Sequence, residues 1–501
     1  MLYISTRGGG EPVTSAQAIK AGIAPDGGLF VPDAPAGLAP DRIKALGPMD
    51  YCGRAAEILP LYLTDFSAAE ISRCVGEAYS PRSFDHPEVA PLHDLDGETH
   101  IMELWHGPTS AFKDMALQIM PRFLPLAVDK TGEKSEIVIL VATSGDTGKA
   151  ALEGFRDVPG TRIMVFFPDQ GVSEVQRLQM VTQEGKNVGV AAVRGNFDDA
   201  QNGVKSIFTN PGMQKELAEK GFKFSSANSI NWGRLAPQIV YYFSAYADLI
   251  GKGALSPGDP VNFVVPTGNF GNILAGYYAR EAGLPVRRLI CAANRNNVLT
   301  DFIRTGVYDR RRHFHKTISP SMDILISSNL ERLLFHLSGG NAGAVRAWMA
   351  ELGEKGGYDV GQSLREKIKQ LFWSDFADDA ETMRTIRKTF EDHHYLVDTH
   401  TAVGISVYRR YRDQTGDTTP AVILSTASPY KFNSSVVRAL LGDQAVAGKS
   451  EFDLLEILSR ASGTGIPGNL RDLDKKPVLH GRVVEREEMP KAVRQFLEES
   501  C

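Results

Sequence analysis

Residues 137–148 read Ile137-Val138-Ile139-Leu140-Val141-Ala142-Thr143-Ser144-Gly145-Asp146-Thr147-Gly148. A short, unbroken run of branched apolar residues is typical of a strand that is buried on both faces of a parallel sheet. The small hydroxyl residues and glycines that follow predict a tight turn that opens a helix. A second apolar run begins at Ile163, about two dozen residues further on, so we expect a right-handed βαβ unit.

Apolar runs of the same kind recur further along the chain. Residues 188–193 predict a third strand, and a second set of strands follows at residues 261–265, 289–293 and 421–425. Two separate α/β units in one chain predict two lobes with a cleft between them. Because ligands bind in such clefts at the carboxyl ends of the strands, we expect the functional residues in the turns that follow these strands.

Sequence texture divides the chain into an N-terminal domain, a small α/β domain, a large domain and a C-terminal extension. Turn-rich sequence and short helices predict the N-terminal domain, and the polar character of the last residues predicts a helical extension. The expected boundaries are 1–90 for the N-terminal domain, 136–245 for the small domain, 91–135 with 246–440 for the large domain, about 301–395 for a helical insertion within it, and 441–501 for the extension.

Composition excludes several classes of protein. The chain has 501 residues with 43% hydrophobic and 23% charged residues, which argues against disorder. A formal net charge of −5 argues against a dedicated nucleic-acid surface. No run approaches the ~20 apolar residues of a membrane span, and the first residues do not resemble a signal peptide. The isolated cysteines form no metal-binding motif and suit a reducing compartment, so we expect a cytoplasmic protein without a metal; they are Cys52, Cys74, Cys291 and Cys501.

A lysine precedes a strongly patterned apolar segment. The segment His106-Gly107-Pro108-Thr109-Ser110-Ala111-Phe112-Lys113-Asp114 leads into apolar residues at helical spacing, which are Phe112, Ala116, Ile119, Met120, Phe123 and Leu124. Pro121 predicts a kink or an end of this helix. Burial and the helix N-terminus would both lower the pKa of Lys113, as a Schiff-base lysine requires. The alternative, which is the commoner one for lysines, is a solvated side chain paired with Asp114.

Three glycine- or amide-rich turns are candidate anion sites. Backbone N–H groups at a strand-to-helix turn bind carboxylates or phosphates, although each turn also fits a plain helix start. The turns are Thr143 to Gly148, Gly268-Asn269-Phe270-Gly271-Asn272, and Asn228-Ser229-Ile230-Asn231-Trp232-Gly233-Arg234. None has the P-loop or GxGxxG spacing of nucleotide-binding proteins. In the third turn, Arg234 suits bidentate phosphate binding, and the alternative is a surface arginine after a helix cap at Asn228 or Ser229.

A hydroxyl-rich segment ends the last predicted strand. It reads Ser425-Thr426-Ala427-Ser428-Pro429-Tyr430-Lys431-Phe432. A hydroxyl group at this position reaches a ligand in the cleft or, as the alternative, caps the turn after the strand.

The order of these motifs resembles that of threonine synthases, which are fold-type-II pyridoxal-phosphate enzymes. The N-terminal Ser5-Thr6-Arg7-Gly8 and Pro25-Asp26-Gly27-Gly28-Leu29-Phe30-Val31-Pro32 match the same family, and the resemblance runs from residue 3 to about residue 435. The lysine motif and Asp146 within SGDTG point to this family rather than to its dehydratase, sulfhydrylase or tryptophan-synthase relatives. One departure is Ser428-Pro429-Tyr430, where the family usually has His-Pro-Ala. The implied fold class is α/β, with two parallel-sheet lobes as in the tryptophan synthase β subunit.

The resemblance implies a role for each motif. Lys113 would hold the cofactor covalently, Thr426 would hydrogen-bond the pyridine nitrogen, and the cofactor phosphate would bind Gly268, Asn269, Phe270, Gly271 and Asn272. The substrate carboxylate and the phenolic oxygen of the cofactor would meet Ser144, Asp146 and Thr147. The leaving phosphate of the substrate would bind Asn228, Ser229 and Arg234.

The implied reaction converts O-phospho-L-homoserine and water to L-threonine and phosphate, with Lys113 moving protons at Cα and Cβ. Two alternatives are a serine/threonine dehydratase-like eliminase, which needs no substrate-phosphate site, and a non-catalytic descendant that binds a phosphorylated metabolite. A nucleotide-binding α/β protein is disfavoured because its motifs are missing. We expect a small-molecule substrate and neither nucleic acid nor membrane as a partner, and the sequence leaves the oligomeric state open.

Overall fold

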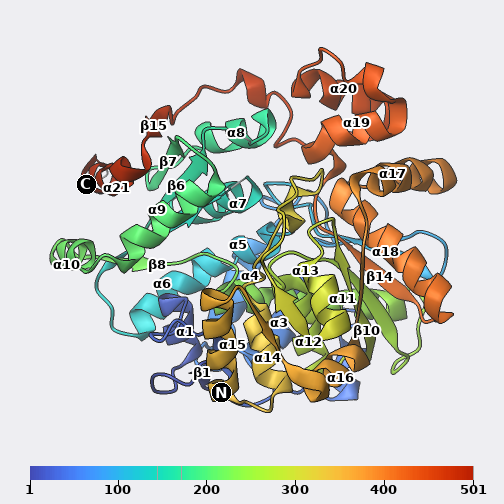
Figure 1. The fold of residues 1–501 in the computed structure, drawn as a ribbon, viewed down its shortest axis with the longest axis horizontal. Helices are drawn as coiled ribbons and strands as arrows, with labels where there is room; N and C mark the ends of the chain where they lie inside the picture. The colour runs from blue at the N-terminus through green and yellow to red at the C-terminus, as the bar shows by residue number, and fades with distance from the viewer. Residues whose placement is uncertain (144, 171, 500–501) are drawn as a thin grey trace.

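Two sheets of mainly parallel strands form the cores of two lobes (Figure 1). The computed structural model describes residues 1–143, 145–170 and 172–499. The small-lobe sheet has the order β15-β7-β6-β5-β8 and is parallel throughout; its strands are Arg482–Val484, Val188–Val193, Thr161–Pro168, Glu136–Ala142 and Phe222–Ser225. The large-lobe sheet has the order β13-β10-β9-β14-β4-β3, with only β3 and β4 antiparallel; its strands are Phe372–Phe376, Val286–Ala293, Val261–Pro266, Ala421–Ser425, Thr99–Glu103 and Leu92–Asp94.

Strand β5 is buried on both faces, as its apolar run predicts. Ile137, Ile139 and Val141 belong to the core that also holds the apolar residues of α7 (Asp146–Phe155) and α8 (Glu174–Val181). Val138 and Leu140 point to the opposite face, which is covered by α9 (Phe197–Thr209), α10 (Pro211–Glu219) and α21 (Met489–Glu499). The predicted βαβ unit is therefore confirmed.

The large-lobe sheet is also covered on both faces. Phe263 of β9 packs at 4.8 Å, centroid to centroid, against Tyr242 of α11 (Trp232–Gly251), and α12 (Gly271–Glu281) lies beside it. On the other face lies α18 (Thr399–Thr415), where a Cβ on Gly404 would lie 3.2 Å from a methyl group of Ile423. Burial on both faces explains why these strands read as continuous apolar runs.

The first ninety residues form short elements, as predicted. Strands β1 (Tyr3–Ser5) and β2 (Phe30–Pro32) pair antiparallel, which brings the two N-terminal motifs together. The helices of this region are α1 (Ser15–Ala21), α2 (Pro40–Ala45), α3 (Tyr51–Ile58) and α4 (Ala68–Ala78).

The segment 301–395 is not wholly an insertion, which corrects the prediction. The segment contains the end of α13 (Val298–Thr305) and four further helices, which are α14 (Leu330–Leu337), α15 (Ala342–Glu354), α16 (Gly361–Leu371) and α17 (Asp379–His393). It also contains the short antiparallel pair β11 (Val307–Asp309) and β12 (Gly357–Asp359). However, β13 pairs parallel with β10 at the edge of the main sheet. Because Ser374 and Asp375 interrupt the apolar residues of this edge strand, its sequence lacks the continuous run of a buried strand.

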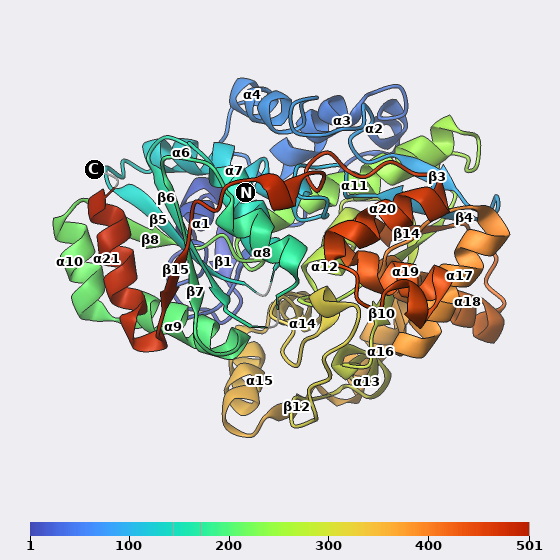
Figure 2. The same ribbon diagram turned by 90° about the horizontal axis from the view of Figure 1, so that it is seen from above.

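The C-terminal residues are not only helical, which is a second correction. After α19 (Asn433–Leu441) and α20 (Glu451–Ser462), the chain crosses from the large lobe to the small lobe (Figure 2). There β15 extends the small-lobe sheet beside β7, and α21 packs against it. A three-residue strand is too short to show a periodic pattern.

The domain boundaries as a whole stay a prediction. Among the helices of the described residues, none is both long and apolar enough to cross a membrane.

Candidate active site

Lys113 lies at the border of the two lobes, just before the short helix α5 (Asp114–Leu117). As expected for Pro121, the helical segment breaks there, and α6 (Met120–Lys130) begins a new helix. The Lys113 side chain is 13% exposed, and its Nζ lies 3.6 Å from Asp146 Oδ2. Asp114 does not pair with it, since its carboxylate accepts hydrogen bonds from the Thr109 N–H and hydroxyl. The structure therefore does not support the alternative of a solvated Lys113–Asp114 pair.

The electrostatic environment of Lys113 favours the neutral amine. Burial lowers the pKa of Lys113 most, and the nearby cations Lys431 and Arg234 lower it further, while Asp146 acts in the opposite direction. The predicted direction of the shift is confirmed, but its main causes are burial and neighbouring cations. A neutral amine is the form that attacks a carbonyl carbon or accepts a proton.

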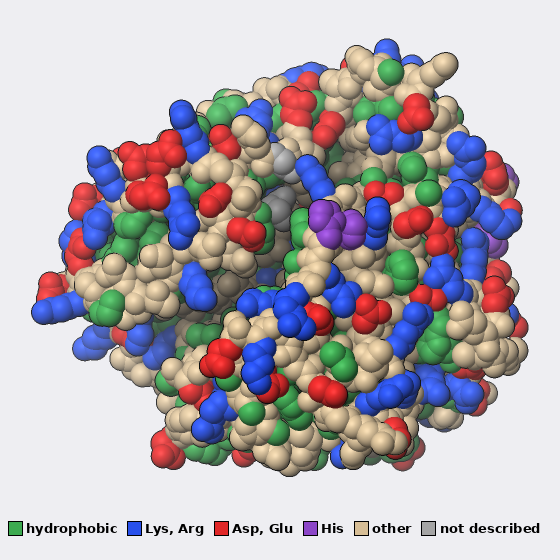
Figure 3. All heavy atoms as spheres, viewed as in Figure 1, with side chains coloured by type: hydrophobic (Ala, Val, Ile, Leu, Met, Phe, Trp, Pro, Cys, Tyr) green, Lys and Arg blue, Asp and Glu red, His purple; other side chains and the backbone are tan. Residues whose placement is uncertain are grey.

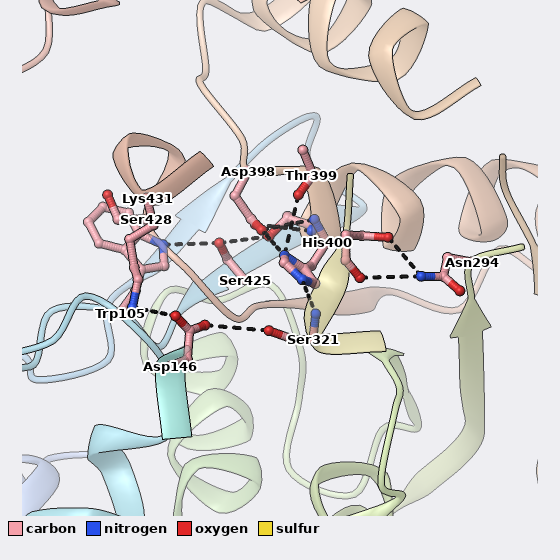
Figure 4. Close-up of polar contacts among 12 residues, drawn as sticks. Trp105, Asp146, Asn294, Ser321, Asp398, Thr399, His400, Ser425, Ser428 and Lys431 are labelled. Atoms are coloured by element: carbon pink, nitrogen blue, oxygen red, sulfur yellow. Dashed lines mark hydrogen bonds and ion pairs between the residues drawn. The ribbon is translucent and has the colours of Figure 1, made fainter. Parts of the chain in front are cut away.

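Asp146, the first residue of α7, lies at the centre of a polar network (Figure 4). Its Oδ1 accepts a hydrogen bond from Gln176 Nε2 at 2.9 Å and lies 2.6 Å from Lys431 Nζ. Its Oδ2 accepts a hydrogen bond from the Ser321 hydroxyl at 3.4 Å. Burial alone would raise the pKa of Asp146, but Lys431 and Lys113 outweigh burial and hold it below its usual range. Asp146 is therefore an ionised carboxylate.

Sequence reasoning missed Lys431 and Gln176. The Lys431 side chain is fully buried, and its Nζ also donates to the Thr109 carbonyl at 2.9 Å. Lys431 belongs to the hydroxyl-rich segment 425–432 that follows β14. Its place in a turn at the carboxyl end of a strand was the sequence feature that could have marked it as a site residue. Ser173 and Gln176 have the spacing of a capping box. Ser173 does cap α8 through the Gln176 N–H, but the Gln176 amide turns to Asp146 instead.

The turn before α7 is held by Thr143, whose hydroxyl oxygen accepts hydrogen bonds from the N–H groups of Gly145 and Gly148, both at 3.0 Å. Thr147 is half-buried in the first turn of α7. Ser144, a predicted substrate contact, lies outside the described residues. The strand–turn–helix expected here is confirmed, while the roles of its side chains stay predictions.

Residues 268–272, which we call loop 268–272, connect β9 to α12. Phe270 has φ +64°, a left-handed conformation that costs roughly 1–3 kcal/mol in residues other than glycine. The side chain of Phe270 does not cap the helix. Asn272 accepts hydrogen bonds from the hydroxyls of Tyr241 and Tyr242, whereas its buried Nδ2 has no partner among the described residues. Gly268 and Asn269 are the less buried members of the loop. A strained turn with an uncapped helix start and an orphan donor fits an anion.

Residues 228–231, which we call loop 228–231, precede α11. The cap of this helix is Asn231, not Asn228 or Ser229 as the alternative supposed. Asn228 is exposed and Ser229 is half-buried. Arg234 is only 3% exposed, so it is not a surface arginine either. Its Nη1 donates to the Ala227 carbonyl, and its Nε has no hydrogen-bond partner among the described residues. Burial lowers the pKa of Arg234 to about 10.

Thr426 lies beside the lysine segment. Its carbonyl accepts a hydrogen bond from the Phe112 N–H at 2.9 Å, and Ala427 forms a bridge with Ala111. The departure at Tyr430 has a local explanation, because its hydroxyl donates to the Thr464 carbonyl at 2.7 Å and so ties this turn to the C-terminal segment. Figure 3 shows the surface hollowed between the two lobes, with Lys and Arg side chains at the border of the hollow.

Three family models match the chain: Threonine synthase N terminus over residues 2–79, Pyridoxal-phosphate dependent enzyme over residues 86–363, and Threonine synthase, C-terminal over residues 401–496. Threonine synthase of Pseudomonas aeruginosa is 40% identical over 482 residues, which cover 96% of this chain and 99% of that protein. The chain belongs to the threonine synthase family. The resemblance predicted from the motifs is therefore confirmed.

Similarity extends to a solved member of the threonine synthase family. The crystal structure of pyridoxal-phosphate-bound threonine synthase from Brucella melitensis superimposes with a TM-score of 0.88 at 37% identity, and covers 100% of this chain and 99% of that chain. The predicted fold class is confirmed. Human threonine synthase-like 1 is 40% identical over 435 residues, but the chain spans only 58% of the length of that relative.

The residues present fit the cofactor of this pyridoxal-phosphate-dependent family. Lys113 offers a buried amine with a lowered pKa, which suits an aldehyde. Loop 268–272 offers an uncapped helix start and the orphan Nδ2 of Asn272, which suit a phosphate. The Thr426 hydroxyl lies on the strand end next to the lysine segment.

Proposed function

We propose that this protein converts O-phospho-L-homoserine and water to L-threonine and inorganic phosphate. The observation that carries this proposal is the buried guanidinium of Arg234, which is separate from loop 268–272, the loop proposed to bind the cofactor phosphate. A substrate that carries its own phosphate gives Arg234 a partner. A dehydratase-type substrate lacks that phosphate and would leave the cation buried without one.

Arg234 favours a dianionic ligand on energetic grounds. Its Nη1 donates to the neutral carbonyl of Ala227, and burial disfavours its charge enough to lower its pKa to about 10. A buried cation is costly unless it is paired, and guanidinium and phosphate pair in a bidentate geometry. In this proposal, Asn228 and Ser229 contribute further contacts to the same phosphate.

The other predicted residues take complementary roles. Lys113 would hold the cofactor through Nζ, Thr426 would face the pyridine nitrogen, and loop 268–272 would bind the cofactor phosphate. Ser144 and Thr147 would bind the substrate carboxylate. Pyridoxal phosphate, when bound, supplies an electron sink that lets protons leave the carbon atoms next to the substrate amine.

Lys113 Nζ is the proton carrier of the proposed reaction. Once it is a free amine, it would accept the Cα proton, pass it on, and then accept the Cβ proton; one proton returns to Cγ after phosphate leaves and one to Cα when water adds its hydroxyl at Cβ and its proton goes to the phosphate. Burial and two nearby cations lower the pKa of Lys113 and so favour the amine form that this task needs. Asp146 stays ionised throughout, since Lys431 compensates its charge. It orients Lys113 and does not compete for the proton. Departure of phosphate from Cγ leaves Arg234 holding the product anion.

The protein is proposed to work in the cytoplasm. The thiols of Cys52, Cys74 and Cys291 are free, and burial raises their pKa to about 11. Unreactive free thiols suit a reducing compartment.

The test incubates the holoenzyme with O-phospho-L-homoserine and measures phosphate and threonine in parallel. We expect equal amounts of both products, and a loss of at least about 10³-fold in turnover for Lys113→Ala with unchanged circular dichroism. L-Serine and L-threonine serve as control substrates. Formation of 2-oxo acids from them, at a rate exceeding phosphate release, would instead identify a dehydratase. Tight binding of phosphohomoserine with no product would identify a non-catalytic binding protein.

A further inference from the structure

The residue that precedes α14, the fully buried Asn329, contacts loop 268–272. The Asn329 backbone N–H and its Nδ2 both donate to the Asn269 carbonyl, at 3.1 and 3.0 Å. Two residues earlier, the Ser327 hydroxyl donates to the Gly268 carbonyl at 2.8 Å. Two successive carbonyls of the loop are therefore held from the side of α14.

The same asparagine reaches loop 228–231. Asn329 Nδ2 lies 3.4 Å from the Ser229 hydroxyl oxygen, at the long end of hydrogen bonding. Asn329 Oδ1 accepts a hydrogen bond from Arg332 Nη1 at 2.6 Å, and Arg332 Nη2 donates to the Ile230 carbonyl at 2.7 Å. Asn329 and Arg332 thus connect two loops that lie about 40 residues apart in sequence and that face different phosphates in the proposed function.

Carbonyl and amide oxygens accept the hydrogen bonds of Arg332. Its side chain is fully buried, its Nε donates to the Phe30 carbonyl at 2.9 Å, and its guanidinium lies 5.8 Å from the ring centre of Trp232. Burial lowers its pKa to about 10. The planar guanidinium group of arginine holds several oxygen acceptors at fixed angles to one another, so it suits a residue that connects separate segments of backbone.

Held carbonyls determine where the loop N–H groups point. In a planar trans peptide, the carbonyl of one residue and the N–H of the next point in opposite directions. Because the carbonyls of Gly268 and Asn269 face α14, the N–H groups of Asn269 and Phe270 face away from it. The hydrogen bonds from Ser327 and Asn329 therefore turn these N–H groups toward the side of loop 268–272 where the cofactor phosphate is proposed to bind.

The N-terminal motif secures α14 in turn. Glu331 accepts hydrogen bonds from the Thr6 hydroxyl at 2.5 Å and from Arg7 Nε and Nη2 at 2.9 and 2.8 Å. The Thr6 hydroxyl also accepts the Leu29 N–H, which joins the second N-terminal motif to the first. These two motifs lie far from Lys113 in sequence, and this network gives them a function.

We propose that Asn329 and Arg332 are positioning residues that orient loops 268–272 and 228–231 together, so that the cofactor-phosphate site and the substrate-phosphate site form as one unit. The inference rests on the proposed function for the identity of the second phosphate. It requires that loss of either side chain weakens both phosphate sites, although neither side chain is assigned a contact with a phosphate.

Two binding measurements test this without turnover. The first is the rate at which pyridoxal phosphate leaves the holoenzyme, followed by loss of its absorbance band. The second is the calorimetric affinity of the holoenzyme for inorganic phosphate. For Asn329→Ala we expect about tenfold faster cofactor loss and about tenfold weaker phosphate binding, since each loop loses a hydrogen bond that orients it. Arg332→Met should behave in the same way, and Arg332→Lys should recover part of the loss.

Matched controls separate positioning from general destabilisation. Asn341→Ala removes an asparagine that caps α15 and touches neither loop. Arg54→Met removes another buried arginine, which is bonded to Ser244 and Asp248. Both controls should lower the melting temperature while leaving both phosphate measurements unchanged. The inference is overturned if Asn329→Ala weakens only one site or neither, or if Asn341→Ala weakens both sites to the same extent. If the wild type did not turn over phosphohomoserine, the proposed function would be rejected, but the two binding measurements on the variants could still be interpreted.

Discussion

Asp146 Oδ1 lies 2.6 Å from Lys431 Nζ, whereas Asp146 Oδ2 lies 3.6 Å from Lys113 Nζ (Figure 4 shows the closer contact). One carboxylate thus faces two lysines, and the closer partner is the lysine that the sequence did not single out. This asymmetry lets Lys431 compensate most of the carboxylate charge. Lys113 is left with a weaker ion pair and loses its proton more readily.

Replacing Lys431 should therefore change the pH dependence of catalysis. In Lys431→Met, Asp146 pairs with Lys113 alone, and a cation that lowers the pKa of Lys113 is gone. We expect the pKa of Lys113 to rise, so that the rising limb of the kcat/KM profile moves about one pH unit higher and turnover at neutral pH falls about tenfold. Lys149→Met is the control, since Lys149 pairs with Glu153 and not with Asp146. An unchanged profile in Lys431→Met would contradict this account.

Arg234→Met should separate substrate binding from stability. The KM for phosphohomoserine should rise at least about 30-fold, since a charge-assisted contact with a dianion is lost. The free energy of unfolding should change by less than about 1 kcal/mol, because the substitution removes a buried cation that pairs with no carboxylate of residues 1–143, 145–170 and 172–499. Arg54→Met should instead lose about 3 kcal/mol, because it leaves the Asp248 carboxylate without its partner. An unchanged KM in Arg234→Met would show that the substrate phosphate binds elsewhere.

The sequence predicted the parts of this molecule whose signals are local. Strands such as β5 and β9 are buried on both faces, so each is a continuous apolar run, and a turn that opens a helix follows each of them. The candidate residues lie in those turns because parallel strands place all their carboxyl ends on one edge. Lys113 could be placed near a helix start because the apolar spacing after it is helical.

Features that depend on distant partners could not be read from the sequence. The edge strands β13 and β15 contact one neighbour each, so neither needs an apolar run. Gln176 has the spacing of a capping box, yet it bonds Asp146 across the space between two helices. Arg332 resembles any helical arginine until the fold brings the Phe30 and Ile230 carbonyls around it. Local pattern carries no information about such contacts.

His106 predicts a pH dependence of stability. Its Nδ1 lies 2.6 Å from Asp85 and its Nε2 2.8 Å from Glu103. Burial disfavours its charge, but the two carboxylates outweigh burial and raise its pKa to about 9. The stabilisation is fully present below pH ~6.5, the pKa in the unfolded chain, and is lost as the pH rises to about 9. It amounts to about 2 kcal/mol, after allowing for solvent screening around the exposed Asp85.

The measurement is chemical denaturation of wild type and His106→Gln between pH 6 and 9.5. The wild type should lose about 2 kcal/mol more than the variant over this range, and the two should converge at the alkaline end. Parallel curves for the two proteins would show that this histidine is not charged in the folded state.

The two glycines of loop 268–272, Gly268 and Gly271, should differ in how well each tolerates replacement by alanine. A Cβ on Gly268 would lie 2.7 Å from the Ser321 carbonyl oxygen, whereas a Cβ on Gly271 would meet its nearest atom, Asn329 Nδ2, at 3.4 Å. Ser321 cannot easily move, because its N–H donates to His400 Nε2 at 3.1 Å and His400 Nδ1 is bonded to the buried Asp398 at 2.6 Å. Gly268→Ala must therefore displace the loop itself.

We expect Gly268→Ala to lower the free energy of unfolding of the cofactor-free protein by about 1–3 kcal/mol, as overpacking does. Gly271→Ala, in the first turn of a helix, should change it by no more than about 0.5 kcal/mol. The displaced loop is the one proposed to bind the cofactor phosphate, so cofactor loss should be faster in this variant as well. Denaturation and the absorbance decay of the holoenzyme measure the two effects. If both alanine variants unfolded at the same denaturant concentration, the backbone of Ser321 would be free to yield, and the rigid support we assign to His400 would be wrong.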